Sequence, residues 1–182
     1  MNARMKTGLT VQGGVSTGKG TTDNCAVRDA LPEIAPTNPY CHVTQGLQTQ
    51  TKLLGTYLVP KVDVQLAATF QNNPGFVLPA VYNMPVAQIS GLGRPLSSGL
   101  GTVNYNLVVP NSVYGPRTTQ LDVRMSKLIR MANKRVSINF DLANILNRND
   151  ILGVTTTYGA AWQTPTTIID PRLFKIGAQF DF

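Results

Sequence analysis

The residues in this chain best suited to chemistry are two cysteines, Cys25 and Cys41, and the only histidine, His42. Fifteen residues with three prolines separate the cysteines, which is compatible with a disulfide-closed loop. Such a bridge would contribute about 3 kcal/mol by constraining the unfolded chain, and it would imply an oxidising compartment. Two alternatives stay open: free thiols in a cytosolic protein, and a metal site with His42 as third ligand. The metal site is the weaker of these, because no paired C-x-x-C accompanies it.

Groups of residues typical of enzymes are missing from the sequence. A single histidine without a convincing nucleophile partner argues against a Ser-His-Asp or Cys-His arrangement. Residues 18–22 (Gly-Lys-Gly-Thr-Thr) match a phosphate-binding loop at two residues only, and no buried parallel strand precedes them. Asp122 and Asp141 could form an acid/base pair, but carboxylates on the polar faces of separate strands are expected anyway. The sequence therefore predicts no enzyme and no cofactor.

The cysteines, the histidine and the aspartates named above lie in or between segments in which apolar and polar side chains alternate, as in β-strands with one apolar face. The C-terminal segment shows this most clearly, because five of its apolar residues fall on one face. These residues are Phe174, Ile176, Ala178, Phe180 and Phe182. The pattern recurs at about residues 9–16, 53–59, 62–71, 120–126 and 136–142. A strand of about ten such residues can cross a bilayer at a tilt of about 45°. The sequence predicts an all-β fold, an antiparallel meander of about six amphipathic transmembrane-type strands.

The connections between these segments alternate in length. Short turns are expected at residues 60–61 and 132–134, and long connections at 17–50, 72–119 and 147–172. Transmembrane barrels have short periplasmic turns and long extracellular loops, whereas the sheets of a soluble sandwich bury their apolar faces against each other. The alternation favours a barrel in the bacterial outer membrane, with a periplasmic C-terminus. Within the longest connection, residues 77–89 and 102–109 are rich in β-formers and could extend the neighbouring strands as a hairpin.

Composition and charge narrow the classes of protein further. Hydrophobic residues make up 42% of the chain, but no run of about twenty of them predicts a transmembrane helix. No apolar stretch typical of a signal peptide follows the first six residues, so export information is expected upstream. Sixteen basic residues exceed nine acidic ones, yet they are scattered, and nucleic-acid binding is not predicted. Four of them lie around one short turn, namely Lys127, Arg130, Lys134 and Arg135. This turn is either simply exposed to solvent or a binding site for a polyanion.

Several segments carry a resemblance to a known family. They are residues 38–41 (Asn-Pro-Tyr-Cys), 59–65, 69–75, 114–117 (Tyr-Gly-Pro-Arg), 120–124 (Gln-Leu-Asp-Val-Arg), 139–147 (Asn-Phe-Asp-Leu-Ala-Asn-Ile-Leu-Asn) and 162–165 (Trp-Gln-Thr-Pro). In this order, and with the last strand ending on phenylalanine, they resemble the C-terminal end of TonB-dependent outer-membrane receptors. The resemblance is to the Oar-like group, which has an N-terminal carboxypeptidase-regulatory-like domain.

The resemblance implies a large barrel around a plug domain and an N-terminal segment that engages TonB. Residues 1–182 would be the C-terminal barrel segment, a fragment without plug or earlier strands, and not transport-competent alone. The intact receptor would take up a scarce ligand, such as a metal chelate or an oligosaccharide. Its partners would be outer-membrane lipid, TonB through the missing N-terminal parts, and the barrel-assembly machinery. That machinery would read the last strand through Phe174, Ile176, Ala178, Phe180 and Phe182.

A second interpretation comes from a different class of protein. The same alternation would suit a secreted all-β binding module whose long loops form a recognition surface at one end.

Overall fold

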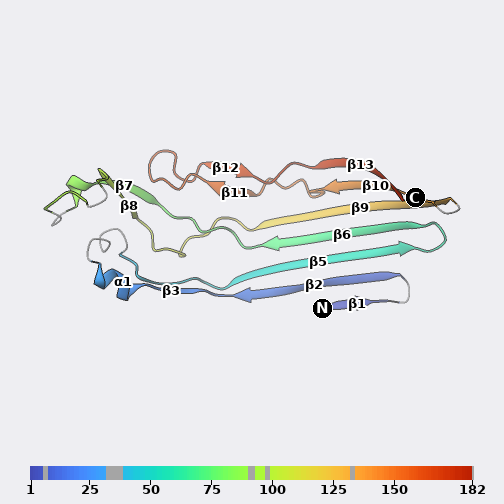
Figure 1. Ribbon diagram of the computed structural model, residues 1–182, viewed down its shortest axis with the longest axis horizontal. Coiled ribbons are helices and arrows are strands. Elements are labelled where there is room, and N and C mark those ends of the chain that lie inside the picture. Colours follow the sequence, from blue (N-terminus) through green and yellow to red (C-terminus); the bar gives the residue numbers. More distant parts are fainter. Residues whose placement is uncertain (6–7, 32–38, 90–92, 97–98, 132–133, 182) are drawn as a thin grey trace.

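The computed structural model of the chain describes residues 1–5, 8–31, 39–89, 93–96, 99–131 and 134–181. The fold is all-β apart from short helices, with one large antiparallel sheet and three separate two-stranded hairpins (Figure 1). The large sheet is open, because its first and last strands do not pair with each other. The predicted all-β class is therefore confirmed, as an open sheet.

Seven strands form the large sheet, each antiparallel to its neighbours. In order across the sheet they are β1 (Asn2–Arg4), β2 (Leu9–Gly18), β5 (Gln48–Val59), β6 (Val64–Asn73), β9 (Thr118–Met131), β10 (Lys134–Ala143) and β13 (Leu173–Asp181). All six predicted strands are present, and β1 is an addition. It is too short for alternation to reveal it, and it pairs only with residues 10–12 of β2.

The turn between β5 and β6 is longer than predicted. It occupies residues 60–63, so Val62 belongs to the turn and is 46% exposed. Lys61 and Asp63 adopt left-handed backbone angles, with φ of 71° and 49°. Such residues leave the ladder, since a strand requires an extended backbone with negative φ. The predicted turn at 132–134 lies partly outside the described residues, and Lys134 is the first residue of β10.

Each long connection contains a hairpin, and all three hairpins lie at one end of the sheet (Figure 1). They consist of β3 (Thr21–Asp23) with β4 (His42–Thr44), β7 (Val81–Pro85) with β8 (Thr102–Asn106), and β11 (Ile151–Val154) with β12 (Pro165–Ile168). The helix α1 (Cys25–Ala30) follows β3, and the 3₁₀ turn η2 (Val86–Gln88) follows β7. The turn at residues 60–63 and the end of β13 lie at the opposite end (Figure 1). Within the β-rich stretches at 77–89 and 102–109, whose strand content the sequence left open, residues 81–85 and 102–106 pair as a hairpin separate from the large sheet.

Buried apolar residues lie outside the large sheet. Among the described residues they are Cys41, Val43, Ala80, Val103 and Ile169, and all belong to the hairpins or their flanks. A soluble domain buries the apolar face of its sheet against a second layer. In the described part of this chain no second layer covers the sheet, so its apolar face has no protein core beneath it.

Candidate functional site: the two faces of the sheet

The strand register places the apolar residues of different strands side by side. One continuous row crosses six strands through paired positions and contains Val11, Gly55, Ala68, Val123, Leu142 and Phe174. The neighbouring row, on the other face, contains Thr10, Thr56, Ala67, Arg124, Asp141 and Lys175. Since successive side chains point to opposite faces, the alternation within each strand adds up to one apolar and one largely polar face.

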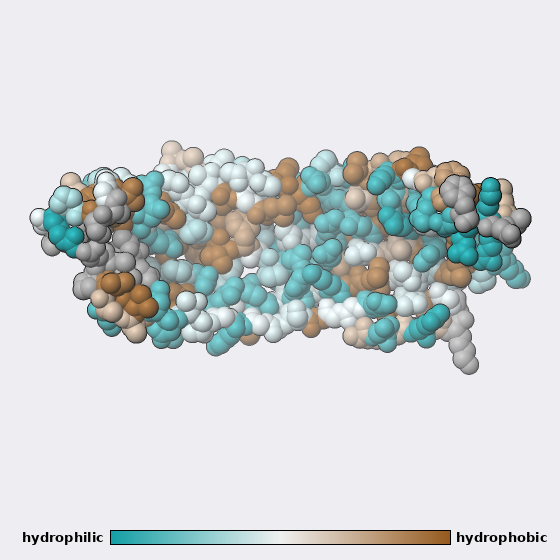
Figure 2. Space-filling model, in the orientation of Figure 1, coloured by the Kyte–Doolittle hydropathy of each residue, from teal (hydrophilic) through white to brown (hydrophobic). Residues whose placement is uncertain are grey.

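The apolar face is uncovered. Phe174, Ile176 and Phe180 of β13 are each about 60% exposed, and Val15 of β2 is 66% exposed. In Figure 2, hydrophobic residues gather along the margin of the sheet where β13 runs. Phe174 also stacks on Phe140 of β10, with ring centroids 6.3 Å apart. More than half of the surface of each of these four residues of β13 and β2 is therefore exposed.

The size of this face exceeds what monomeric soluble proteins usually expose. Ten residue steps separate Leu121 from Met131 along β9, or about 33 Å at about 3.3 Å per residue. At a tilt of about 45° this length covers about 23 Å, close to the apolar band of about 25 Å on membrane barrels. One charged residue, Lys127, lies within this length, and its ammonium group reaches out to the Val62 carbonyl in the turn between β5 and β6. Six full strands about 4.8 Å apart give an area on the order of 700 Å², above the 300–600 Å² that is roughly typical of the largest apolar patch on a monomer.

The apolar face stops near the hairpins, where polar residues replace the apolar ones. Asn72 of β6 donates to Thr119 Oγ1 of β9 over 2.7 Å, and Arg117 donates to Asn72 Oδ1 and to the Thr49 carbonyl over 2.6 Å each. These bonds tie the ends of β5, β6 and β9 together. The polar rim marks where the apolar face stops and the region of the hairpins begins.

The polar face is hollowed and carries paired charges. Arg124 of β9 donates to both carboxylate oxygens of Asp141, the paired residue of β10. Lys175 of β13 is paired with Asp141 on its other side. These side chains, with Thr69 and Asp122 among others, line a hollow of about 440 Å³. Asp122 accepts bonds from Gln120 and from the Asn144 backbone, so Asp122 and Asp141 have separate partners and do not form the imagined acid/base pair.

A buried polar network follows β10, and it was not predicted from the sequence. Asn144 is 2% exposed with φ of 47°, and its side-chain amide donates to the carbonyls of Arg148 and Asp170 over 2.8 Å each. Its side-chain oxygen accepts a bond from the Arg148 backbone. The signal in the sequence was the pair of asparagines at 144 and 147, since asparagine tolerates the left-handed region better than most residues and both positions adopt it.

The same network holds the carboxylate of Asp150 in place. Asp150 accepts bonds from the Arg148 guanidinium over 2.7–2.9 Å and from the Thr119 backbone N–H over 2.7 Å, and its side chain is 8% exposed. The hydrogen bond from Arg148 is the main reason that the pKa of Asp150 lies below its usual value. The network thereby attaches the third long connection, residues 147–172, to the start of β9.

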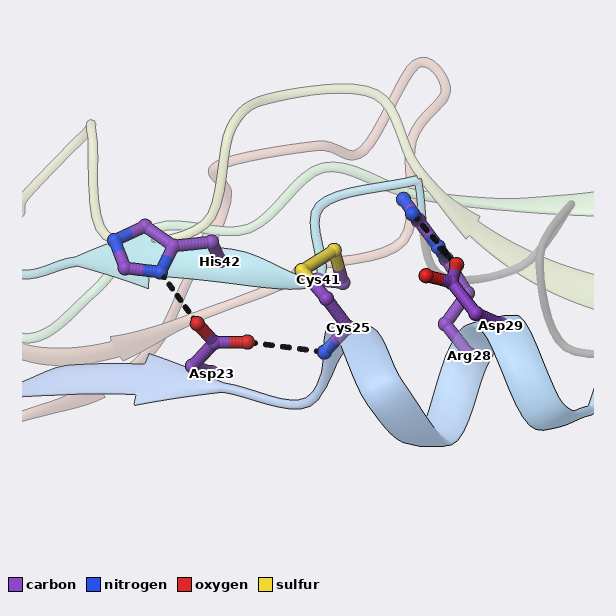
Figure 3. Close-up of a disulfide and its surroundings, with 6 residues drawn as sticks. All are labelled: Asp23, Cys25, Arg28, Asp29, Cys41 and His42. Carbon is purple, nitrogen blue, oxygen red and sulfur yellow. Dashed lines mark hydrogen bonds and ion pairs between the residues drawn. A yellow bond between two sulfur atoms is a disulfide. The ribbon is translucent and has the colours of Figure 1, made fainter.

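The predicted pairing of Cys25 with Cys41 is present as a disulfide, which joins the start of α1 to the residue before β4 (Figure 3). Because both sulfur atoms are used in this bond, His42 gains no thiolate neighbour and instead binds Asp23, with Nδ1 and Oδ2 3.0 Å apart. The Cys25 backbone N–H donates to the other oxygen of Asp23. This N–H, and secondly His42, lower the pKa of the Asp23 carboxyl.

The remaining predicted site residues fall into two groups. Residues 18–22 lead into strand β3 and open no helix, so they form no phosphate-binding loop. Phe174, Ile176, Ala178 and Phe180 share the apolar face of β13, while Phe182 lies outside the described residues. The outer edge of β13 pairs with no strand in the described part of the chain. Their predicted role in barrel assembly remains a prediction.

Two aromatic residues between β11 and β12, Tyr158 and Trp162, contact each other. Trp162 donates its indole N–H to the Pro79 carbonyl over 3.2 Å and lies 5.8 Å from the Tyr158 ring. Thr157 bridges to Val81, so the second and third connections touch.

No helix in the described residues has the length and apolar character needed to span a membrane. Within the same residues, no group of three or more His, Cys, Asp or Glu side chains is arranged to hold a metal ion. No protein-family description matches the chain, and neither a curated protein nor a solved structure is significantly similar to it.

Proposed function

We propose that the seven-stranded sheet is part of a transmembrane β-barrel in the bacterial outer membrane. The observation that carries this proposal is the uncovered apolar face, which runs in register across the sheet while the buried apolar residues lie elsewhere. In a barrel of this kind the apolar face contacts lipid and the polar face lines the lumen. The hairpins would then be extracellular, and the short turns and the C-terminus periplasmic.

The sheet needs further strands to close. Six antiparallel steps separate β1 from β13, so the two edge strands run in the same direction. Joining β13 to β1, within one sheet or between two copies, would create a parallel pair, whereas bacterial barrels are antiparallel with an even number of strands. Closure therefore requires an odd number of additional strands from elsewhere in the barrel. An open edge in lipid would leave backbone groups without partners.

Within this class, we propose the C-terminal part of a TonB-dependent receptor that takes up a scarce ligand, such as a metal chelate or an oligosaccharide. The order of the motifs at 120–124 and 139–147 and in the last strand supports this proposal. The plug and the TonB-binding segment would be supplied by other parts of the receptor. Phe174, Ile176, Ala178 and Phe180 would serve the barrel-assembly machinery, because the free edge of β13 is available for β-augmentation.

Spin labels on neighbouring residues of β9 test the membrane proposal. Single variants Val123→Cys, Arg124→Cys and Met125→Cys of the full chain would be labelled and bound to lipid bilayers, which requires contact of the apolar face with lipid but does not require a closed barrel. We expect labels at 123 and 125 to be accessible to oxygen dissolved in lipid, and the label at 124 to be accessible to a water-soluble nickel chelate. Thr69→Cys and Phe70→Cys on β6 form a matched second pair, with Phe70 on the lipid side.

A secreted binding module predicts a different result. The chain would then be a monodisperse monomer without detergent, and labels at 123 and 125 would be shielded from both reagents or equally exposed to water. Either outcome would overturn the membrane proposal.

A further inference from the structure

The positive charge of the chain is concentrated at the end with the short turns. Among the described residues there, six basic residues stand against two carboxylates. The basic residues are Arg4, Lys61, Lys127, Arg130, Lys134 and Arg135, and the carboxylates are Asp63 and Asp181. The hairpin end has six basic residues and four carboxylates within the described ranges, and Arg28–Asp29 and Arg148–Asp150 form ion pairs there. The net charge of the described residues is therefore +4 at the short-turn end and +2 at the hairpin end, so the larger share lies at the short-turn end.

The two carboxylates at this end lie beside arginines of the polar face. Arg130 and Arg135 are paired across β9 and β10. Asp63 lies 3.4 Å from Arg130, and Asp181 of β13 is paired with Arg135. The row of paired residues that contains Arg130 and Arg135 belongs to the polar face, so these charged side chains point away from the apolar face. The arginines are thus flanked by acidic residues.

The lysines occupy the other face. Lys127 is paired with Val64 and Ile138, which places it on the apolar face. Its half-buried side chain reaches the turn between β5 and β6, where the ammonium group donates to the Val62 carbonyl. Lys134, paired with Met131, lies on the same face nearer the turn end of the hairpin. Long lysine side chains at the edge of an apolar surface place their stems on the apolar part and their charges in the polar boundary layer.

We infer that Lys127 and Lys134 bind the phosphate groups of anionic phospholipids in the leaflet at the short-turn end. A lipid is the partner that fits, because the two cations share a face with apolar residues that would contact its acyl chains. Ile129 and Val136 lie between the two lysines on this face. A soluble polyanion has no apolar part that would contact Ile129 and Val136. The inference rests on the proposed membrane function.

Flotation of the full chain with lipid vesicles tests the inference. Vesicles of neutral phosphatidylcholine measure membrane association alone, and vesicles with added phosphatidylglycerol measure the contribution of anionic headgroups. We expect tighter association with the anionic vesicles. Because one basic residue near such a surface is worth about 1 kcal/mol, or about fivefold in affinity, the Lys127→Gln/Lys134→Gln variant should lose roughly 25-fold on anionic vesicles only.

Matched controls separate position from charge. Lys19→Gln and Lys52→Gln remove the same charge at the hairpin end and on the polar face, and should keep the preference for anionic vesicles. Lys127→Arg/Lys134→Arg should also keep it. Excess inorganic phosphate should not displace the chain, whereas displacement would indicate a site for free phosphate and would overturn the lipid assignment.

The outcomes distinguish the two proposals. Unchanged preference for anionic vesicles in the Lys127→Gln/Lys134→Gln variant would overturn the lipid site and leave the membrane proposal standing. Failure of every variant and of the unaltered chain to associate with neutral vesicles would overturn the membrane proposal itself.

Discussion

Arg124 and Asp141 face each other across β9 and β10, joined through two guanidinium nitrogens and both carboxylate oxygens, with Lys175 on the far side of Asp141. One carboxylate thus lies between two cations on the hollowed polar face. Removing the carboxylate of Asp141 and removing the guanidinium of Arg124 therefore leave different sets of charges on this face.

We predict that Asp141→Asn destabilises the chain more than Arg124→Gln. The first change leaves Arg124 and Lys175 without the carboxylate between them, whereas the second leaves Asp141 with Lys175. Both effects should shrink in high salt, because Arg124 is 59% exposed and exposed charges are screened. Urea midpoints of the refolded chain at low and high salt measure this order. Equal midpoints, or a larger loss for Arg124→Gln, would contradict it.

Asn144→Ala should be among the more damaging single changes in the structure. It removes three side-chain hydrogen bonds from a residue that is 2% exposed and leaves buried backbone groups without partners. We expect a loss of about 2–4 kcal/mol in the free energy of unfolding. Asn147→Ala is the matched control, since Asn147 shares the left-handed backbone but is exposed. A control that costs as much as Asn144→Ala would assign the effect to the backbone angle.

Loss of the disulfide should loosen the first connection and spare the sheet. Cys25 and Cys41 are 16 positions apart, and closing a loop of about this size constrains the unfolded chain by about 3 kcal/mol. Because β3 and β4 pair only with each other, Cys25→Ser/Cys41→Ser should speed trypsin cleavage at Arg28 while far-UV circular dichroism stays unchanged. Asp23→Asn, which keeps the bridge, should protect Arg28 far better. A collapse of the sheet signal would show that the hairpin supports the sheet.

Acid should release the third connection through Asp150. Its folded pKa lies below the usual value because Arg148 binds the carboxylate. The stabilisation is therefore complete above the unfolded pKa of about 3.9 and is lost as the pH falls through the lowered folded pKa. Amide exchange of β11 and β12, followed from neutral to acid pH, measures this. Subtracting the profile of Asp150→Asn, which does not titrate at that position, isolates the contribution of Asp150. Identical profiles would contradict the assignment.

Alternation predicted the strands of the sheet because each strand has one apolar and one polar side. It predicted the faces correctly from Leu121, Val123 and Met125 of β9 without knowledge of the neighbours. The register could not be read in this way, since it depends on turn geometry. The left-handed angles of Lys61 and Asp63 lengthen one turn by two residues, and alternation says nothing of such angles.

The candidate site could be predicted only where its residues stand out by their type or by their spacing. Cys25 and Cys41 stood out as a pair, and the apolar residues of β13 stood out by their spacing. The side chain of Asn144 reaches residues up to 26 positions away and binds backbone carbonyls, which every residue type has and which the sequence therefore does not reveal. Lys127 was noted for its charge, but its place on the apolar face emerges from its pairing with Val64 and Ile138.

The shared register of the two faces has a consequence for the kinds of mutation the gene can tolerate. One codon inserted in the middle of β9 would reverse the orientation of every later residue up to the next turn, moving Arg130 to the apolar face and Ile129 to the polar face. The same insertion in the stretch between β11 and β12 would shift no strand of the large sheet. Natural variants of this chain should therefore differ in length within the connections and keep constant length within the strands.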